Sequence, residues 1–99
     1  MVLTVLEANI PLGQEAALQA AYQAAATAAL PPGLVRTELL RDSRDPSRWR
    51  IQTWWTSREV LEAMRTAGTP AGVLMFRAAG AEPSLSIFEV VSAIPRTTT

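Results

Sequence analysis

The chain has 99 residues, with nine acidic and nine basic residues and no net charge at neutral pH. This length fits one domain, and a neutral chain has no strong field to attract nucleic acid or an anionic membrane. Cysteine and histidine are absent, and every basic residue is arginine. Disulfides, thiolate catalysis and lysine Schiff bases are therefore excluded, and the commonest general base and metal ligand is missing.

Apolar residues are plentiful, but they do not form a membrane-spanning run. Hydrophobic residues make up 48% of the chain and charged residues 18%, and no stretch reaches the ~20 apolar residues that cross a bilayer. The opening residues, MVLTVLEANI, have no basic leader of the kind that begins a signal peptide. We therefore expect a cytoplasmic protein with no membrane contact. Because charge is scarce, part of its apolar surface should be covered by a partner.

In chain order, apolar spacing and turn signals predict four strands and three helices. They are a strand over residues 2–10, a helix over 14–29, strands over 34–41 and 48–55, a helix ending near residue 67, a short helix over 71–78 and a strand over 84–92. The first helix ends at Pro31-Pro32-Gly33, since proline cannot supply the helical N–H. The polar link at residues 42–47 is short, so the strands beside it should form an antiparallel hairpin.

The second helix has a start signal in Thr56-Ser57-Arg58-Glu59. This spacing is typical of a capping box, in which the Thr56 hydroxyl accepts from the Glu59 N–H and the Glu59 carboxylate reaches back to the Thr56 N–H. Pro70 suits the first position of the short third helix. We expect one domain over residues 1–95 and a frayed, disordered tail over residues 96–99.

The element order is β-α-β-β-α-β, which matches the ferredoxin-like motif of the α+β class with an antiparallel sheet. One face of the strand at residues 48–55 carries Trp49, Ile51, Thr53 and Trp55, and the other carries Arg50, Gln52 and Trp54. Both faces hold tryptophan, so we expect helices to cover one and a second subunit the other. The predicted homodimer interface contains Arg50, Gln52 and Trp54. Trp49, near the hairpin, should give partial surface cover.

Several segments together resemble the antibiotic biosynthesis monooxygenase-like family of dimeric α+β barrels. They are Ile10-Pro11-Leu12-Gly13-Gln14-Glu15, Pro32-Gly33-Leu34, Glu38-Leu39-Leu40-Arg41-Asp42, Asp45-Pro46 through Leu61, and Phe88-Glu89-Val90. The resemblance covers nearly the whole chain. It implies a ferredoxin-like protomer that pairs into a dimer, with a pocket between sheet and helices. It also implies a broad choice of activities, from cofactor-free oxidation of polyphenols to haem degradation.

Compared residue by residue, this sequence keeps only some of the residues that form the family's active sites. Trp55 matches a tryptophan that lines the active site of the monooxygenases. The asparagine and tyrosine that accompany it are replaced here by Ile51 and Leu61. In the haem degraders, an asparagine matches Leu6 and a tryptophan matches Met64. Their haem-ligating histidine has no counterpart, so haem degradation is disfavoured.

The candidate substrate pocket consists of apolar and aromatic residues on the predicted inner faces. They are Leu6, Tyr22, Ile51, Trp55, Leu61, Met64, Met75 and Phe76. Trp55 would stack an aromatic substrate and could offer its indole N–H, and it is the tentative catalytic residue. The alternative is ordinary core packing, with Trp55 as the anchor between strand and helix.

Strand glutamates are the remaining candidates for acid–base chemistry. Glu7, Glu38 and Glu89 could supply a base if buried, but pairing with strand arginines such as Arg36 or Arg50 is the preferred interpretation. Asp42, Ser43 and Asp45 resemble part of a calcium loop, and a hairpin turn explains them better. No metal site, cofactor motif or phosphate-binding glycine pattern is present.

The sequence leaves three functions open. The first is a small-molecule-binding protein that resembles the cofactor-independent monooxygenases and acts on or binds an apolar, aromatic metabolite. The second is a non-enzymatic ligand-binding or structural dimer, which Ile51 and Leu61 favour. The third is a small-metabolite isomerase or lyase, which would need a buried glutamate or the Tyr22 hydroxyl in the pocket.

Overall fold

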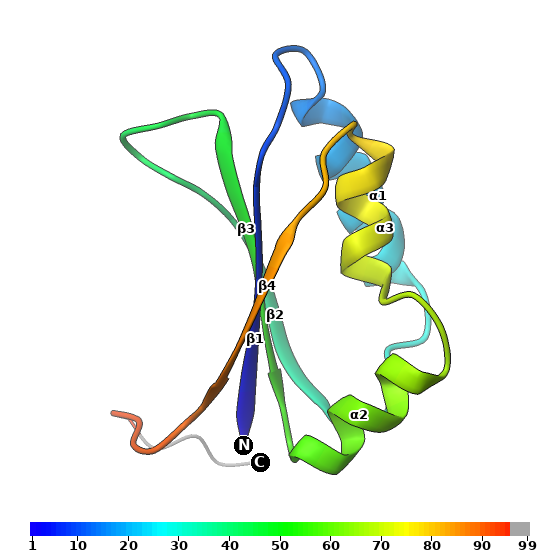
Figure 1. The fold of residues 1–99 in the computed structure, drawn as a ribbon, viewed down its shortest axis with the longest axis vertical. Helices are drawn as coiled ribbons and strands as arrows, with labels where there is room; N and C mark the ends of the chain where they lie inside the picture. Colours follow the sequence, from blue (N-terminus) through cyan, green and yellow to red (C-terminus); the bar gives the residue numbers. More distant parts are fainter. Residues whose placement is uncertain (96–99) are drawn as a thin grey trace.

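The fold is a four-stranded antiparallel sheet with three helices on one face (Figure 1). The computed structural model describes residues 1–95. Its elements are β1 (Val2–Asn9), α1 (Glu15–Thr27), β2 (Leu34–Arg41), β3 (Arg48–Trp55), α2 (Arg58–Thr66), α3 (Ala71–Ala78) and β4 (Ser84–Glu89). The strands lie in the order β2-β3-β1-β4. This arrangement confirms the predicted ferredoxin-like protomer. No described helix is long and apolar enough to cross a membrane.

The sheet buries the face that the alternation in β3 predicts. Trp49, Ile51, Thr53 and Trp55 are all buried beneath the helices. The prediction of Trp49 as partial surface cover is therefore wrong, since only 5% of it is exposed. Trp49 shares the inner face with Ile51 and packs into the core with Leu18 and Phe76. A position near a hairpin does not expose a side chain when helices extend over the end of the strand.

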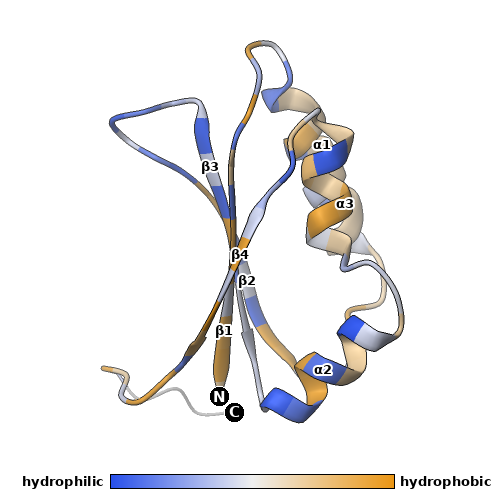
Figure 2. Cartoon of the chain, in the orientation of Figure 1, coloured by the Kyte–Doolittle hydropathy of each residue, from blue (hydrophilic) through white to orange (hydrophobic). Residues whose placement is uncertain are grey.

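The helices pack on the sheet through two separate groups of buried residues. The larger group lies under α1 and α3 and contains Leu6, Ile10, Leu18, Trp49, Ile51, Phe76 and Ala79. The smaller group lies under α2 and contains Val2, Trp55 and Leu61. Figure 2 shows hydrophobic residues along α1 and α3 and hydrophilic residues at the β2–β3 hairpin. The inner layer is therefore divided, with Leu6 and Ile51 on one side and Trp55 on the other.

The cap of α2 differs from the predicted capping box. Ser57, not Thr56, is the N-cap, and its hydroxyl accepts from the Val60 N–H at 3.2 Å. The Thr56 N–H donates to the Gly33 carbonyl at 2.9 Å. Because this bond joins Thr56 to the loop before β2, the helix begins one residue later than predicted. Because the Thr56 N–H is already donated to Gly33, the Glu59 carboxylate does not accept it as the capping box would require.

Other boundaries also differ from the prediction, by one to three residues. Pro70 is the N-cap of α3 instead of its first helical residue. The last strand ends at Glu89 and not at residue 92. The Val90 N–H donates to the Met1 carbonyl at 3.0 Å, just past the last strand pair, Val2 with Glu89. The predicted tail over residues 96–99 lies outside the described residues.

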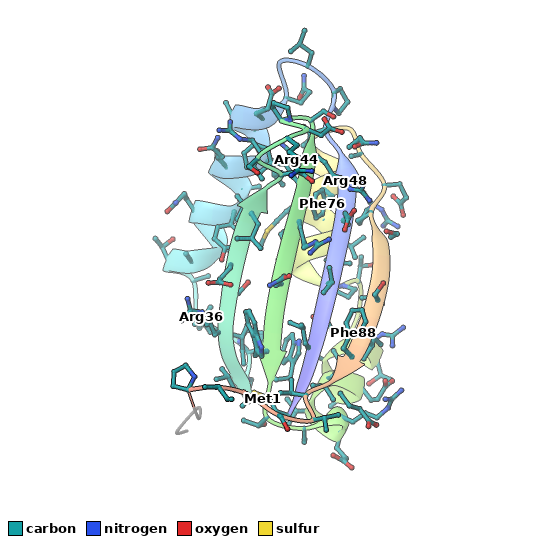
Figure 3. The ribbon with its side chains drawn as sticks, turned by 90° about the vertical axis from the view of Figure 1, so that its left-hand side faces the viewer. Met1, Arg36, Arg44, Arg48, Phe76 and Phe88 are labelled. Atoms are coloured by element: carbon teal, nitrogen blue, oxygen red, sulfur yellow. The ribbon has the colours of Figure 1, made fainter. Side chains whose placement is uncertain are left out.

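The other face of the sheet carries no helix (Figure 3). One row across it contains Arg36, Trp54, Leu3 and Phe88, because Trp54 pairs with both Arg36 and Leu3, and Leu3 pairs with Phe88. Phe88 is 53% exposed and Trp54 is half-buried. Two rows further along, Leu40, Arg50, Glu7 and Ser84 lie side by side. This face is therefore apolar at one end and charged at the other.

Candidate functional site

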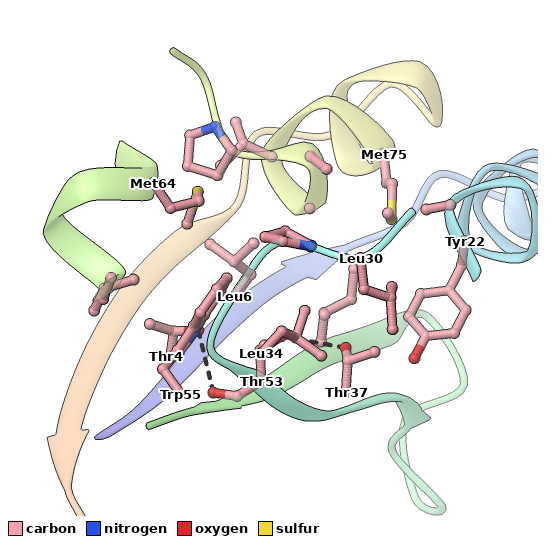
Figure 4. Close-up of a pocket in the computed structure, with 18 of the residues that line it drawn as sticks. Thr4, Leu6, Tyr22, Leu30, Leu34, Thr37, Thr53, Trp55, Met64 and Met75 are labelled. Atoms are coloured by element: carbon pink, nitrogen blue, oxygen red, sulfur yellow. Dashed lines mark hydrogen bonds between the residues drawn. The ribbon is translucent and has the colours of Figure 1, made fainter. Parts of the chain in front are cut away.

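A cavity of about 260 Å³ lies between the inner face of the sheet and the helices (Figure 4). Strand residues form its floor: Thr4, Leu6, Leu34, Thr37, Ile51, Thr53, Trp55 and Leu85. Helices and loops form its other walls: Tyr22, Ala25, Ala26, Ala28, Ala29, Leu30, Pro31, Leu61, Met64, Arg65, Pro70, Ala71, Gly72, Val73 and Met75. The cavity occupies the space where the two groups of buried residues do not meet.

Small residues create this space. The end of α1 and the segment after it contribute Ala25, Ala26, Ala28 and Ala29 to the wall. On α3, a Cβ atom at Gly72 would lie 2.6 Å from Cδ1 of Leu6, so only glycine lets α3 lie this close to β1 without movement. Alanine raises helix propensity and lets α1 form without side chains that would fill the interior. The run of alanines at the end of α1 therefore leaves room for the cavity.

Trp55 forms one end of the cavity and is held in a fixed orientation. Only 4% of the residue is exposed, and its indole N–H donates to the Thr4 hydroxyl at 3.1 Å. The Thr4 hydroxyl in turn donates to the Thr53 carbonyl at 3.4 Å. An indole has one donor. The predicted role of the Trp55 N–H as a donor to substrate is therefore not available in this arrangement, and the ring face is what Trp55 can offer.

Three threonines form a polar row across the floor. Thr37 pairs with Thr53 and Thr53 pairs with Thr4, so their side chains lie next to one another on β2, β3 and β1. The Thr37 and Thr53 hydroxyl oxygens are 3.2 Å apart. The neighbouring rows are apolar, with Leu39, Ile51 and Leu6 on one side and Leu34, Trp55 and Val2 on the other. Polarity in the floor is therefore confined to one narrow row.

Charge is almost absent from the cavity. Among the described lining residues, Arg65 is the only ionisable group apart from the Tyr22 phenol. Arg65 lies 3.5 Å from Glu62, and 39% of its side chain is exposed, so it belongs to the rim. No described carboxylate lines the walls. The site can desolvate and orient a neutral molecule, but it has no carboxylate base within it.

Seven of the eight predicted pocket residues line the cavity. They are Leu6, Tyr22, Ile51, Trp55, Leu61, Met64 and Met75. Phe76 is placed elsewhere, because it is completely buried in the core beneath α1 and α3. Sequence reasoning missed the threonine row and the wall after α1. The threonines carried a usable signal, since Thr53 shares the inner face with Ile51 and Trp55, but the pairing of β1 and β2 with β3 was needed to bring the other two beside it.

The strand glutamates lie outside the cavity. Glu7 forms ion pairs with Arg48 and, at 2.7 Å, with Arg50 on the face without helices. Glu38 pairs with Arg36 at 2.6 Å. Glu89 is exposed at the end of β4. The structure thus agrees with the arginine-pairing interpretation for Glu7 and Glu38.

The aspartates of the hairpin stabilise its turn. Asp42 accepts from the backbone N–H groups of Arg44 and Asp45, and Asp45 accepts from Ser47. The hydrogen bonds donated by the Arg44 and Asp45 backbone N–H groups lower the pKa of Asp42. Within residues 1–95, no group of three acidic side chains is placed to hold a metal ion.

Replacing Glu7 with glutamine should change how stability depends on pH. Hydrogen bonds from Arg50 and then Arg48 hold the pKa of Glu7 below its ordinary value of 4.5. A carboxylate with a lowered pKa stabilises the folded state above that ordinary value, and the stabilisation is lost as pH falls through the folded pKa. Urea denaturation measured across a range of pH should therefore show that Glu7→Gln loses less of its free energy of unfolding at acid pH than the wild type does. At neutral pH, the variant should lose on the order of 1 kcal/mol.

Glu89→Gln is the matched control for this measurement, since Glu89 is another strand carboxylate but is exposed. If the free energy of unfolding falls with decreasing pH as steeply in both variants as in the wild type, Glu7 does not contribute to the pH dependence of folding.

Comparison with known proteins gives the same architecture. Residues 1–69 match the family model described as antibiotic biosynthesis monooxygenase. SnoaB, a cofactor-independent oxygenase from Streptomyces nogalater, has a TM-score of 0.71 at 20% identity, covering 96% of this chain and 97% of that protein. A mutant of MhuD with two manganese protoporphyrin IX molecules bound per active site has a TM-score of 0.72 at 22% identity, covering 97% and 100%. No curated protein matches in sequence at a significant level. Identities this low show a shared fold.

Proposed function

Since this chain belongs to the antibiotic biosynthesis monooxygenase family, we propose that its cavity binds an apolar, aromatic small molecule and that the protein oxygenates it without a cofactor. The cavity itself is the observation that supports this proposal. Its walls are aliphatic and aromatic except for the threonine row and Arg65 at the rim, and Trp55 presents a ring face at one end. Such a pocket, apolar with a few convergent polar groups, is the usual form of a small-molecule site.

The size of the cavity supports a ligand of more than one ring. Its volume of about 260 Å³ exceeds the roughly 150 Å³ of an engineered apolar cavity that binds benzene. A fused-ring molecule could lie between Trp55 and the methionines Met64 and Met75, whose flexible side chains adapt to irregular shapes. Tyr22 closes the helix side, with its hydroxyl turned toward β2 (Figure 4).

The proposed mechanism is positioning. The walls would exclude water from an enolisable or phenolic substrate, whose own carbanion reacts with O₂ while Trp55 orients the ring. For a methylene flanked by aromatic rings, one oxygen atom of O₂ becomes the product carbonyl and the other leaves as water with the two methylene hydrogens. The lining holds no carboxylate base, so the substrate must be acidic enough to lose its proton readily.

The assembly we propose is a homodimer in which the helix-free faces of two sheets pack together. Arg50, Gln52 and Trp54 would lie in this interface, and Phe88 would join them from β4. A symmetric pair is the commonest way to cover such a face.

Oxygen consumption with anthrone tests the proposed oxygenase. The wild type should accelerate O₂ uptake above the spontaneous rate. Trp55→Ala should lower this acceleration at least about tenfold through lost positioning, whereas Trp55→Phe should retain part of it because a ring remains. Leu74→Ala is the control, since Leu74 is exposed on α3 and does not line the cavity. Rates unchanged by either replacement of Trp55 would remove that residue from the mechanism.

A non-enzymatic ligand-binding protein is the second candidate. The lack of a carboxylate in the walls favours it. Tight binding of anthrone with no acceleration of O₂ uptake would select this function over the oxygenase. The isomerase or lyase alternative depends on Tyr22 alone, because Glu7 and Glu38 pair with arginines outside the cavity.

A further inference from the structure

The threonine row contains one more hydroxyl hydrogen than the surrounding protein uses. The hydrogen of the Thr4 hydroxyl is already used, because it is donated to the Thr53 carbonyl while the Thr4 oxygen accepts from Trp55. The Thr37 and Thr53 hydroxyls are joined by a single hydrogen bond of 3.2 Å in which either can be the donor. Two hydroxyls carry two hydrogens, so one hydrogen remains after this bond is made. It is donated to no acceptor within residues 1–95.

The position of this hydrogen makes it available to a ligand. Thr53 is 8% exposed, and both threonines line the cavity. Figure 4 shows Thr37 and Thr53 among the side chains that line the cavity, joined by this hydrogen bond. Thr37 is half-buried, so water can reach this donor in the empty cavity. A ligand that filled the cavity without offering an acceptor would leave the donor unsatisfied, at a cost on the order of 1–3 kcal/mol. Valine has nearly the same shape as threonine and would have avoided this cost at both positions.

The surroundings limit what the acceptor can be. The adjacent rows are aliphatic or aromatic, and the Trp55 indole is already bonded to Thr4. Within residues 1–95, the only guanidinium on the wall is that of Arg65, which lies at the rim beside Glu62. No positive charge therefore lies next to the pair to compensate an anion. An uncharged oxygen on an otherwise apolar molecule satisfies the free donor without burying a charge.

We infer that the Thr37–Thr53 pair is the specificity-determining contact of this cavity and that it binds one uncharged oxygen acceptor, a carbonyl or a phenol, on an apolar ring system. The inference rests on the proposed ligand-binding function of the cavity. Trp55 then supplies a stacking surface, and the threonine pair determines which edge of the ligand faces the strands. This role distinguishes ligands that carry an oxygen from hydrocarbons of the same shape.

Fluorenone and fluorene test this role, because they differ only in a carbonyl in place of a methylene. Fluorenone cannot enolise, so its binding is measured without turnover. In isothermal titration calorimetry, the wild type should bind fluorenone about tenfold more tightly than fluorene, as expected for one well-placed hydrogen bond. Thr37→Val/Thr53→Val should weaken fluorenone binding by about the same factor and leave fluorene binding within about twofold.

Two further variants keep the result interpretable. Thr37→Ser/Thr53→Ser retains both hydroxyls and should retain the preference for fluorenone, which a loss of packing alone would not predict. Thr27→Val makes the same chemical change at an exposed hydroxyl that donates to Ala24 and should behave as the wild type. Equal binding of both probes by the wild type, or an unchanged preference in the double valine variant, would overturn the inference while the pocket stands. If neither probe binds the wild type, the proposed function fails and the inference fails with it.

Discussion

Replacing Trp54 with glutamate is expected to convert the proposed dimer to a monomer. Trp54 lies in the row with Leu3 and Phe88 on the helix-free face of the sheet, and it is only half-buried in the isolated chain. Tryptophan at the centre of an interface typically contributes 2 kcal/mol or more. In a symmetric dimer the substitution occurs twice. We therefore expect the dimer dissociation constant to rise by at least about 100-fold, because each introduced carboxylate would also be buried without a partner.

Size-exclusion chromatography with light scattering at micromolar concentration measures this change directly. Leu74→Glu is the matched control, because Leu74 is 52% exposed on α3, which belongs to the opposite layer. It should leave the dimer intact. A wild-type protein that elutes as a monomer, or a Trp54→Glu variant that remains dimeric, would show that this face is not the interface.

Much of this fold can be predicted from the sequence because its alternation is unambiguous. In β3, alternation places Ile51 and Trp55 on one face and Trp54 on the other. The structure confirms this register, because Ile51 and Trp55 are buried and Trp54 is half-buried. Where prediction fails, a bond between distant segments is responsible. The N-cap of α2 moves from Thr56 to Ser57 because the Thr56 N–H bonds to Gly33, which is 23 residues earlier (56 − 33). Local spacing contains no information about such a bond.

The candidate site can likewise be predicted only in part from local sequence spacing. Apolar pocket residues such as Leu61 and Met64 follow from helical spacing. The threonine row does not, because Thr4, Thr37 and Thr53 come from three strands and become neighbours only through pairing. Phe76 was misplaced because a period of 3.6 identifies the inner face of α3 without distinguishing core from cavity. Which inner residues line the cavity depends on small neighbours such as Ala25 and Ala29.

Gly33→Ala should be one of the most destabilising small substitutions in the chain. Gly33 has φ +82°, and a Cβ atom there would lie 2.3 Å from Cγ1 of Val60. The left-handed backbone costs an ordinary residue roughly 1–2 kcal/mol, and overpacking adds typically 1–3 kcal/mol. We expect a loss of roughly 2–5 kcal/mol in the free energy of unfolding, a large share of the total for a small domain. Urea denaturation followed by circular dichroism measures it.

Two comparisons separate the backbone cost from the clash. Gly13 has a similar φ of +89° but no atom within 4 Å of its ideal Cβ position, so Gly13→Ala should show only the backbone part. Removing the two methyl groups of Val60 in a Gly33→Ala/Val60→Ala variant should recover the clash part, seen as a coupling energy in the double-mutant cycle. Equal losses in Gly13→Ala and Gly33→Ala would contradict the close approach to α2. The close approach of Gly33 to α2 also affects the cavity. The Gly33 carbonyl accepts from the Thr56 N–H, and the next residue, Leu34, pairs with Trp55 and forms part of the cavity floor.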